Sequence, residues 1–171
     1  MIYPIVKYGQ PVLETQAATI TEFDTPELNK LLDDMFESMY AARGVGLAAP
    51  QIGVGKRIAV IDITTGEDPA QKIVLINPEI IATEGTQTGE EGCLSLPTFR
   101  ETVTRPQRVT VRAHDGKGKV FEMTGEDLLA RAFLHETDHL SGKLYINHIS
   151  PLKRDLIRRK IRKLQKADDW K

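Results

Sequence analysis

The sequence contains one cysteine and lacks any long apolar run. A single cysteine cannot form a disulfide within the chain, so the fold does not require an oxidising compartment, and the Cys93 thiol is available for metal binding or chemistry. No segment approaches the roughly 20 apolar residues that span a bilayer. Residues 1–10, interrupted by Lys7, resemble neither a signal peptide nor a transit peptide. We therefore expect a cytoplasmic protein without a membrane partner.

Repeats, low-complexity tracts and linker-like stretches are also missing, and the net charge is only −1. A nearly neutral chain is not suited as a whole to coating nucleic acid. Apolar residues make up 40% and charged residues 27%, a mixture typical of a globular domain. The length suits one hydrophobic core, so we predict a single catalytic domain over residues 1–171. Nothing in the sequence demands more than a monomer.

Two segments carry the signals of a helix that begins with a capping residue followed by proline. Thr25 and Pro26 fit the N-cap and the first position of a helix predicted over about 26–42. Ser150, followed by proline, marks the start of a C-terminal helix over about 151–166. In the first helix, the spacing of apolar residues predicts a buried stripe formed by Leu28, Leu31, Leu32, Met35 and Met39.

A third helix is predicted over about 125–140. Thr124 and Asp127 are spaced as in a capping box, with Asp in place of Glu, and Gly142 is a natural stop signal. Residues three or four apart share one face of a helix. One face of this helix therefore carries Leu128, Ala132, His135 and His139.

The middle of the chain is rich in short β-forming runs, at 58–63 and 73–76. The apolar residues Val109, Val111 and Ala113 alternate with polar ones, and the pair Asp115-Gly116 predicts a turn before a further strand at 120–123. Strands that lie between separate helices indicate an α+β fold. We expect antiparallel β-sheets packed around a central metal-binding helix, with a C-terminal helix added.

The strongest local signal is the segment His135-Glu136-Thr137-Asp138-His139. Two histidines four residues apart project from one helix face and can bind one divalent ion, while the adjacent glutamate can exchange protons with water at that ion. The alternative is a polar helix with two exposed histidines. The apolar residues on the same face favour the metal, because buried histidines need partners.

A catalytic site of this kind has three protein ligands and one open position. No glutamate follows Glu136 in the sequence, and Tyr145 occupies the position at which some zinc proteases carry a third histidine. Cys93 is therefore the favoured third ligand, because a thiolate binds divalent transition metals strongly. The alternative is a buried cysteine that acts as a small apolar residue.

The segment GVGLAAPQ at 44–51 is rich in small residues that permit a tight chain path beside a ligand. Gln51 adds an amide that can donate to a carbonyl oxygen. The alternative is an ordinary helix-to-strand connection in which Gly44 ends the first helix. That alternative does not exclude functional roles for Gly46 and Gln51.

Taken together, these segments resemble the three signature motifs of the peptide deformylase family. The family pattern is GφGφAAxQ, EGCφS and HExxH, where φ is apolar, and this sequence has GVGLAAPQ at 44–51, EGCLS at 91–95 and HETDH at 135–139. The resemblance covers nearly the whole chain. One departure is Leu134, where the family often has glutamine, and we expect it to change packing and not chemistry.

The resemblance implies a metal-dependent hydrolase that removes the N-formyl group from the formylmethionine of nascent polypeptides and releases formate. Cys93, His135 and His139 would bind the metal, with water in the fourth place. Glu136 would take a proton from that water and deliver it to the leaving amine. Members of the family are typically iron(II) enzymes that also work with nickel, cobalt or zinc, and the sequence does not identify the metal.

The resemblance also implies how the substrate is held. The metal, the side chain of Gln51 and the backbone N–H of Leu94 would stabilise the developing oxyanion. For Arg131 we expect either an apolar stem along the pocket with the charge at its mouth, or a solvated side chain. Backbone contacts to the peptide would come from Val45, Gly46 and Gly92, and the methionine pocket would be shaped by Leu128, Arg131 and Ala132.

The C-terminal segment is strongly basic. From Lys153 to Lys166 it has eight basic residues and one acidic residue, Asp155. Its apolar residues form a predicted stripe of Leu152, Leu156 and Leu164, with Ile157 and Ile161 beside it. Such a basic amphipathic helix is most simply the solvated face of a packed helix. The resemblance implies docking of this helix on the ribosome near the exit of the nascent chain.

Three other classes of protein were weighed against this interpretation. A metalloprotease of another class would cleave internal peptide bonds and use a third ligand other than Cys93. A non-enzymatic ribosome-binding factor would carry a degraded site, yet every catalytic residue type is present. A structural metal module would close its site with four protein ligands, and no fourth ligand is evident.

Overall fold

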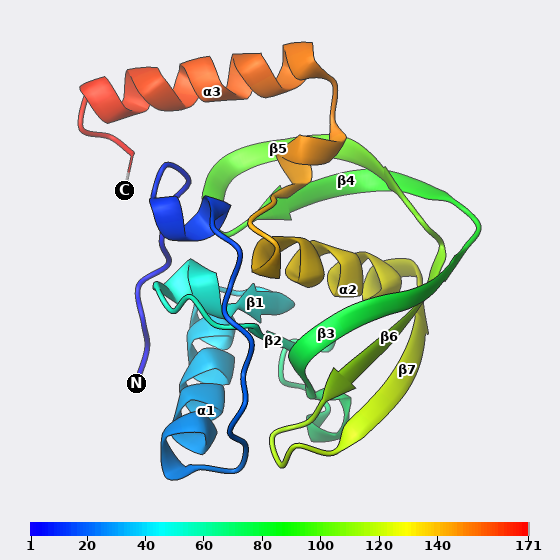
Figure 1. Ribbon diagram of the computed structural model, residues 1–171. Coiled ribbons are helices and arrows are strands. Elements are labelled where there is room, and N and C mark those ends of the chain that lie inside the picture. The colour runs from blue at the N-terminus through cyan, green and yellow to red at the C-terminus, as the bar shows by residue number, and fades with distance from the viewer. Residues whose placement is uncertain (171) are drawn as a thin grey trace.

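Antiparallel strands surround one helix in the computed structural model, which describes residues 1–170 (Figure 1). Five strands form one sheet in the order β1-β2-β3-β6-β7, and two form a second sheet, β4-β5. This arrangement confirms the predicted α+β class. The strands are β1 Gly46–Ala48, β2 Ile58–Ile61, β3 Ile73–Glu84, β4 Gln87–Cys93, β5 Leu96–Arg105, β6 Arg108–His114 and β7 Val120–Glu126.

Two of the three α-helices begin where the capping signals predict. The Thr25 hydroxyl accepts a hydrogen bond from the Leu28 N–H at 3.1 Å, and the Ser150 hydroxyl accepts one from the Lys153 N–H at 3.2 Å. The α-helices are α1 Pro26–Ala41, α2 Asp127–Leu140 and α3 Pro151–Lys166, and the short 3-10 helices are η1 Pro11–Glu14, η2 Ala49–Ile52, η3 Pro69–Gln71 and η4 Tyr145–His148.

The five-stranded sheet places its two faces against different helices. Residues that alternate along β1, β2 and β3 point to opposite sides of the sheet. One side packs with α2 and includes Ala48, Ala59, Ile61, Leu75, Ala130 and Phe133. The other side packs with α1 and includes Leu28, Leu32, Met35, Met39, Leu47, Ile58, Val60 and Ile76. Helix α2 is thus enclosed between the two sheets, as Figure 1 shows.

Helix α2 begins two residues later than the sequence indicates, and its predicted capping box is wrong. Gly125 and Glu126 belong to β7, where they pair with Val109 and Arg108 of β6. The N-cap is Glu126, and its side chain makes no capping hydrogen bond. Pairing with β6 extends β7 through the residues at which the sequence predicts the start of the helix. The predicted end is confirmed, because Gly142 has a positive φ of 76° just after the helix.

The predicted hairpin between β6 and β7 is confirmed, but β4 and β5 were not predicted. Val109, Val111 and Ala113 are buried, and Asp115 accepts hydrogen bonds from the N–H groups of Lys117 and Lys119 within the turn. Strands β4 and β5 are mostly polar on both faces, so they lack the apolar alternation of a half-buried strand. Their pairing is visible only in the tertiary structure.

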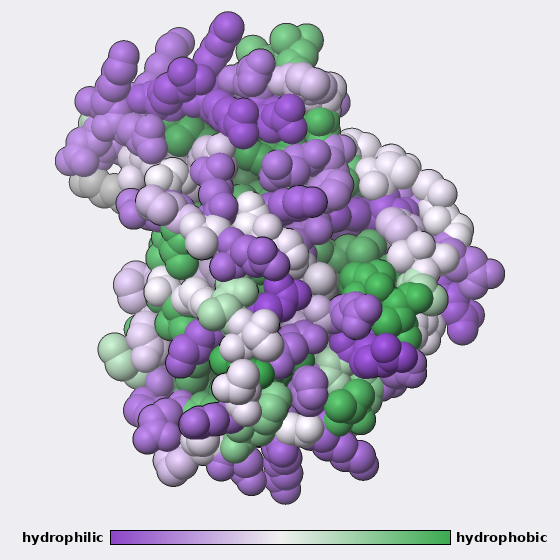
Figure 2. Space-filling view, viewed as in Figure 1, coloured by the Kyte–Doolittle hydropathy of each residue, from purple (hydrophilic) through white to green (hydrophobic). Residues whose placement is uncertain are grey.

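Helix α3 lies across the outside of the two-stranded sheet and buries two isoleucines (Figure 1). Ile157 and Ile161 are buried in a third cluster with Leu96, Val103 and Tyr145. The predicted stripe was misplaced, because the Leu152 and Leu156 side chains are 72% and 46% exposed. Hydrophilic residues cover the outer side of α3 in Figure 2. Among residues 1–170, no helix has the length and apolar character of a membrane span.

Candidate metal centre and substrate cavity

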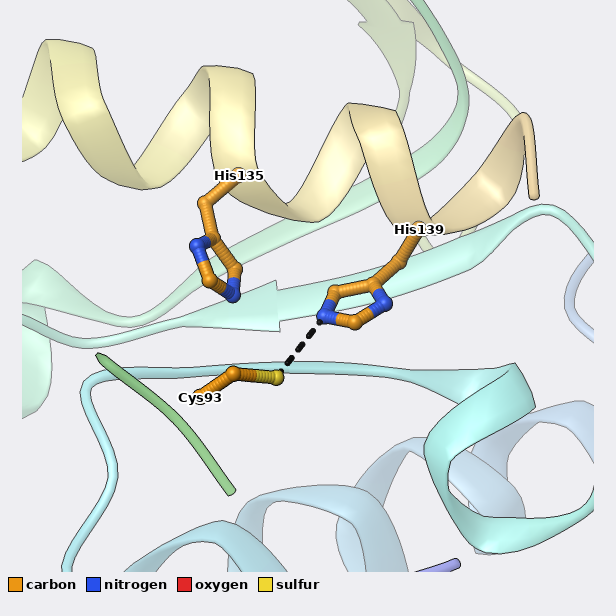
Figure 3. A group of neighbouring side chains, drawn as sticks. All are labelled: Cys93, His135 and His139. Carbon is orange, nitrogen blue, oxygen red and sulfur yellow. Dashed lines mark hydrogen bonds between the residues drawn. The ribbon is translucent and has the colours of Figure 1, made fainter. Parts of the chain in front are cut away.

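Helix α2 and the end of β4 bring the three predicted metal ligands together. One nitrogen from each of His135 and His139 and the sulfur of Cys93 all lie within 4.8 Å of one another. The Cys93 Sγ atom is 3.3 Å from the His139 Nε2 atom. In Figure 3 both rings extend from α2 toward the Cys93 side chain on the facing segment. The spacing along the helix supplies two candidate ligands, and the tertiary fold supplies the third.

The two histidines favour the thiolate form of Cys93. Burial of the thiol raises its pKa, but His139 and His135 beside it outweigh this effect and lower the pKa to about 5. Thiolate, and not thiol, is the form of cysteine that binds metal. At neutral pH this site therefore presents a sulfur already in its ligating form.

The donor set and the unsatisfied polar atom beside it fit a divalent transition metal. One thiolate and two imidazoles suit first-row ions such as iron, cobalt, nickel and zinc. Within the described part of the chain, the buried Glu136 Oε1 atom beside these residues has no hydrogen-bond partner. Buried polar atoms are rarely left unpaired unless water, an ion or a substrate satisfies them. Three protein ligands also leave one position open, as in catalytic sites.

Glu91 orients the first histidine from behind. The Glu91 Oε1 atom is 2.8 Å from His135 Nδ1, so the other ring nitrogen, Nε2, is directed toward Cys93. Arg105 donates to both oxygens of this carboxylate, through Nε at 3.0 Å and Nη2 at 2.7 Å. Carboxylates commonly fix the ring of a metal-binding histidine in this way. Burial raises the pKa of Glu91, but His135 and Arg105 lower it well below its usual range.

The same arginine ties the β4–β5 sheet to the far end of α2. Arg105 donates through Nη1 to Asp138 Oδ2 at 2.8 Å, and His148 Nε2 lies 2.8 Å from the same oxygen. Glu91 and Arg105 are each only 4% exposed. A buried ion pair is tolerated when every charge has a partner. Motif spacing did not identify Glu91 or Arg105 as positioning residues, because their contacts join segments distant in the sequence.

Gln51 directs its amide N–H group toward Cys93, one of the candidate ligands. Its Oε1 atom accepts a hydrogen bond from the Ala48 N–H at 3.0 Å, which fixes the orientation of the amide. The Nε2 atom then lies 3.5 Å from Cys93 Sγ and 3.3 Å from Ser95 Oγ. Gln51 is 1% exposed. A donor held in this way costs little reorganisation when charge develops beside it.

Glu136 lies in space that Gly46 leaves open. A Cβ atom added to Gly46 would overlap the Glu136 carboxylate. Glu136 is 4% exposed, and burial raises its pKa, although His135 and His139 act to lower it. A carboxylate with a raised pKa is a stronger base near neutral pH. Position 46 in the first motif is therefore glycine because a side chain there would displace the Glu136 carboxylate, which the motif alone does not reveal.

A cavity of about 540 Å³ opens beside these residues. It is lined by all the predicted site residues except His139, namely Val45, Gly46, Gln51, Gly92, Cys93, Leu94, Leu128, Arg131, Ala132, His135 and Glu136. Leu128 is 48% exposed at the helix start, whereas Ala132 is 5% exposed. A volume of this size is typical of a small-molecule or peptide side-chain pocket.

The Arg131 charge lies neither at the mouth of the pocket nor in solvent, so both expectations for it were wrong. Its guanidinium donates to Glu91 Oε2 at 2.5 Å and to the Val103 carbonyl oxygen at 3.2 Å, and the residue is 8% exposed. The buried Glu91 carboxylate attracts it, because a charge without a partner would be costly there.

Gly44 lies at the end of α1, as expected for a helix terminus, and its N–H donates to the Met39 carbonyl oxygen at 3.0 Å. The residue with the positive φ, 58°, is Arg43 and not Gly44. A Cβ atom on Gly44 would lie 3.0 Å from the Leu94 side chain. Gly44 therefore serves close packing against the Cys93 segment. Leu134, the departure from the family pattern, is partly buried and packs against the α2 core.

Comparison with known proteins agrees with this geometry. The family described as polypeptide deformylase matches residues 2–155. A peptide deformylase of Acidobacterium capsulatum is 62% identical over 170 residues, which cover 99% of this chain and 99% of that protein. A peptide deformylase of Cellvibrio japonicus is 48% identical over 167 residues, or 97% of each chain.

Solved structures show the same fold. The crystal structure of a peptide deformylase from Legionella pneumophila is similar with a TM-score of 0.90 and 47% sequence identity. The match covers 100% of this chain and 99% of that chain.

Proposed function

The chain belongs to the peptide deformylase family and removes the N-formyl group from nascent polypeptides, and from this premise we propose the roles of the residues in its cavity. Cys93, His135 and His139 bind the metal. The observation that carries this proposal is the convergence of these three residues beside the buried Glu136 carboxylate, whose Oε1 atom has no hydrogen-bond partner.

A divalent ion, when bound, supplies Lewis-acid activation of the formyl carbonyl group and of water. Glu136 accepts a proton from the attacking water, whose oxygen forms a bond to the formyl carbon. The C–N bond then breaks, and Glu136 returns the proton to the leaving amine. The products are formate and a free amino terminus. The buried position of Glu136 supports this role, because the raised pKa makes its carboxylate an effective base.

The developing negative charge on the formyl oxygen needs fixed hydrogen-bond donors. The Gln51 amide and the Leu94 backbone N–H provide them. The orientation of Gln51, fixed by Ala48, supports its assignment. Leu94 follows the ligand Cys93 in the turn between β4 and β5, which supports a position beside the reacting atoms.

The peptide binds along the walls of the same cavity. Val45, Gly46 and Gly92 contact its backbone, and the methionine side chain enters between Leu128, Arg131 and Ala132. All six line the cavity. The Arg131 stem and Ala132 offer apolar surface for that side chain, while the Arg131 charge stays paired with Glu91.

We test the assignment by measuring formate release from formyl-Met-Ala-Ser with anaerobically purified protein. Cys93→Ala is expected to lose the metal and the activity together. Gln51→Ala is expected to fold and keep its metal but to lose about 100- to 1000-fold in kcat/KM, the usual effect of one oxyanion donor. Gln71→Ala, at the exposed end of η3, is the matched control and should have the activity of wild type. Full activity in Gln51→Ala would remove its role.

The metal is proposed to be Fe²⁺, with Ni²⁺, Co²⁺ or Zn²⁺ able to substitute. The thiolate and imidazole donors support a first-row ion but do not select one. Anaerobic purification followed by elemental analysis should recover iron together with the highest turnover. Protein that contains only zinc and is fully active would contradict the preference for iron.

Docking on the ribosome through α3 is a further part of the proposal. The exposed basic residues of α3, among them Lys160 and Lys163, support a contact with nucleic acid. Lys160→Glu combined with Lys163→Glu should reduce co-sedimentation with ribosomes and leave turnover of short peptides unchanged. The matched control is Lys117→Glu with Lys119→Glu at the exposed β6–β7 turn. Equal losses in both double variants would show a non-specific effect of charge.

The chain is also proposed to act as one domain and as a monomer in the cytoplasm, where nascent chains emerge. Packing of α3 onto the β4–β5 sheet through Ile157 and Ile161 supports one domain over residues 1–171. One cooperative unfolding transition and the hydrodynamic mass of a single chain are expected. Separate melting of α3 or a dimer mass would contradict these two points.

A further inference from the structure

One wall of the substrate cavity is poorly held by the sheet that carries it. In the register of β4 and β5, Gly92 pairs with Arg100 and the next residue, Cys93, pairs with Leu96. Pro97, Thr98 and Phe99 therefore bulge out of the ladder, and all three line the cavity. Thr98 has a positive φ of 71°, a backbone conformation that residues other than glycine rarely adopt. Something outside the ladder must keep this bulge in place.

That support comes from the C-terminal end of the chain. The ring of Trp170 meets the ring of Phe99 edge to face, with centroids 6.0 Å apart and an interplanar angle of 63°. Both rings belong to the cluster that contains the buried residues Ile157 and Ile161 of α3. Edge-to-face pairs of this kind are favourable beyond the area that they bury. Phe99 lines the substrate cavity, and Trp170 lines a second cavity of about 650 Å³, so the ring pair forms part of both walls.

Trp170 is itself fixed to the segment that carries a metal ligand. Its indole N–H donates to the Tyr8 carbonyl oxygen at 2.8 Å. The Tyr8 N–H in turn donates to the Ser95 carbonyl oxygen at 2.9 Å, two residues after Cys93. Arg158 of α3 donates through Nε to the Tyr8 hydroxyl at 3.0 Å. The indole is thus held from one side by Tyr8 and presses against Phe99 on the other.

We propose that Trp170 is a positioning residue for substrate, which holds the Phe99 bulge in the form that binds the peptide residues following formylmethionine. The proposal rests on the proposed function of the cavity. The methionine side chain is assigned to the α2 wall, and Phe99 belongs to the separate β5 wall, so it meets a later part of the peptide. Without Trp170 the bulge would have to be ordered at each binding event, which weakens binding. The ligands and Glu136 would be unaffected.

The kinetic test compares two substrates, formyl-Met-Ala and formyl-Met-Ala-Ser-Ala. Trp170→Ala is expected to raise KM for the longer peptide about 3- to 10-fold, the effect of losing one aromatic pair. The KM for the shorter peptide and kcat for both should stay unchanged. Trp170→Phe keeps an aromatic ring at the contact and should restore most of the loss. An unchanged KM, or equal changes for both peptides, would overturn the proposal.

Two controls separate this effect from others. Tyr8→Phe removes only the hydroxyl that accepts from Arg158 and leaves the carbonyl that accepts from Trp170, so KM should not change for either peptide. Wild-type protein is assayed first on both substrates. Absence of formate release by wild type would count against the proposed function. If wild type is active and Trp170→Ala has the same KM values, only this inference is contradicted.

A second measurement does not depend on whether Trp170→Ala folds. Trp170 is the only tryptophan of the chain, so intrinsic fluorescence reports its surroundings directly. In the Glu136→Ala variant, which should retain uncleaved peptide, saturating formyl-Met-Ala-Ser-Ala is expected to shift the emission, and formyl-Met-Ala is expected to leave it unchanged. An emission spectrum that does not change when the longer peptide is saturating would overturn the proposal.

Discussion

Helices α2 and α3 have similar lengths, 14 and 16 residues, and both combine apolar residues with many charged ones. Helix α2 buries Arg131, Glu136 and His139, whereas α3 buries only Ile157 and Ile161. The difference lies in what faces each helix. Segments distant in the sequence bring Glu91 and Arg105 to α2, and water surrounds most of α3. A charge is buried where a partner meets it, because burial alone costs several kcal/mol.

The comparison also explains the division of labour that we propose. The polar residues of α2 are fixed by tertiary contacts, as a catalytic constellation requires. Basic residues of α3 such as Lys160 and Lys163 are exposed to water, which suits a surface that meets a large charged partner. The contrast can therefore be tested by substituting one acidic, one basic and one capping residue in each helix and comparing the two variants of each pair.

The largest expected effect comes from the acidic residues. Glu136→Gln in α2 should keep its metal but reduce kcat/KM about 100- to 10,000-fold, because it removes the general base. Asp155 of α3 is exposed, so Asp155→Asn should leave turnover unchanged. Formate release and metal content are measured on both. A metal-free Glu136→Gln protein would show that the carboxylate is a ligand and not the base.

An intermediate effect is expected from the arginines. Arg131→Ala removes a partner of the buried Glu91 and should lower the free energy of unfolding by about 3 kcal/mol. Arg159→Ala, on the exposed face of α3, should change it by less than about 0.5 kcal/mol. Urea unfolding of both variants at the same metal concentration measures the difference. Similar values for the two would show that the buried network contributes little to stability.

The smallest effect concerns how each helix starts. Ser150→Ala removes the hydroxyl that caps α3 and should cost about 1 kcal/mol in stability. Glu126→Ala at the start of α2 removes no capping hydrogen bond, and its exposed ion pair with Arg108 is worth less. Thermal unfolding of the two variants tests this order. A larger loss in Glu126→Ala would contradict it.

The same contrast accounts for the success and failure of prediction along the chain. The starts of α1 and α3 depend on Thr25 and Ser150, whose contacts lie within three residues, so they were predicted correctly. The start of α2 depends on the pairing of β7 with β6, and contacts from Gln87 and Gln107 hold Asp127 there. Local sequence carries no record of such long-range contacts, and the predicted capping box failed for that reason.

The candidate site divides in the same way. Spacing on a helix identified His135 and His139, and the missing third ligand pointed to Cys93, which the structure brings beside them. Arg105 carries no comparable signal, because nothing in its neighbourhood shows that it will reach both Glu91 and Asp138. Strands β4 and β5, which carry Glu91 and Arg105, are too polar to be recognised by alternation.

The sequence by itself determined the three motifs, two of the three helix starts and the chemistry of the candidate metal ligands. These features follow from covalent geometry and from residue types a few positions apart. The tertiary structure alone decided that Arg131 turns inward to Glu91, that Gly46 leaves space for Glu136, and that Trp170 reaches Phe99. Each of these contacts joins segments far apart in the chain, and they form only when burial of the core brings those segments together.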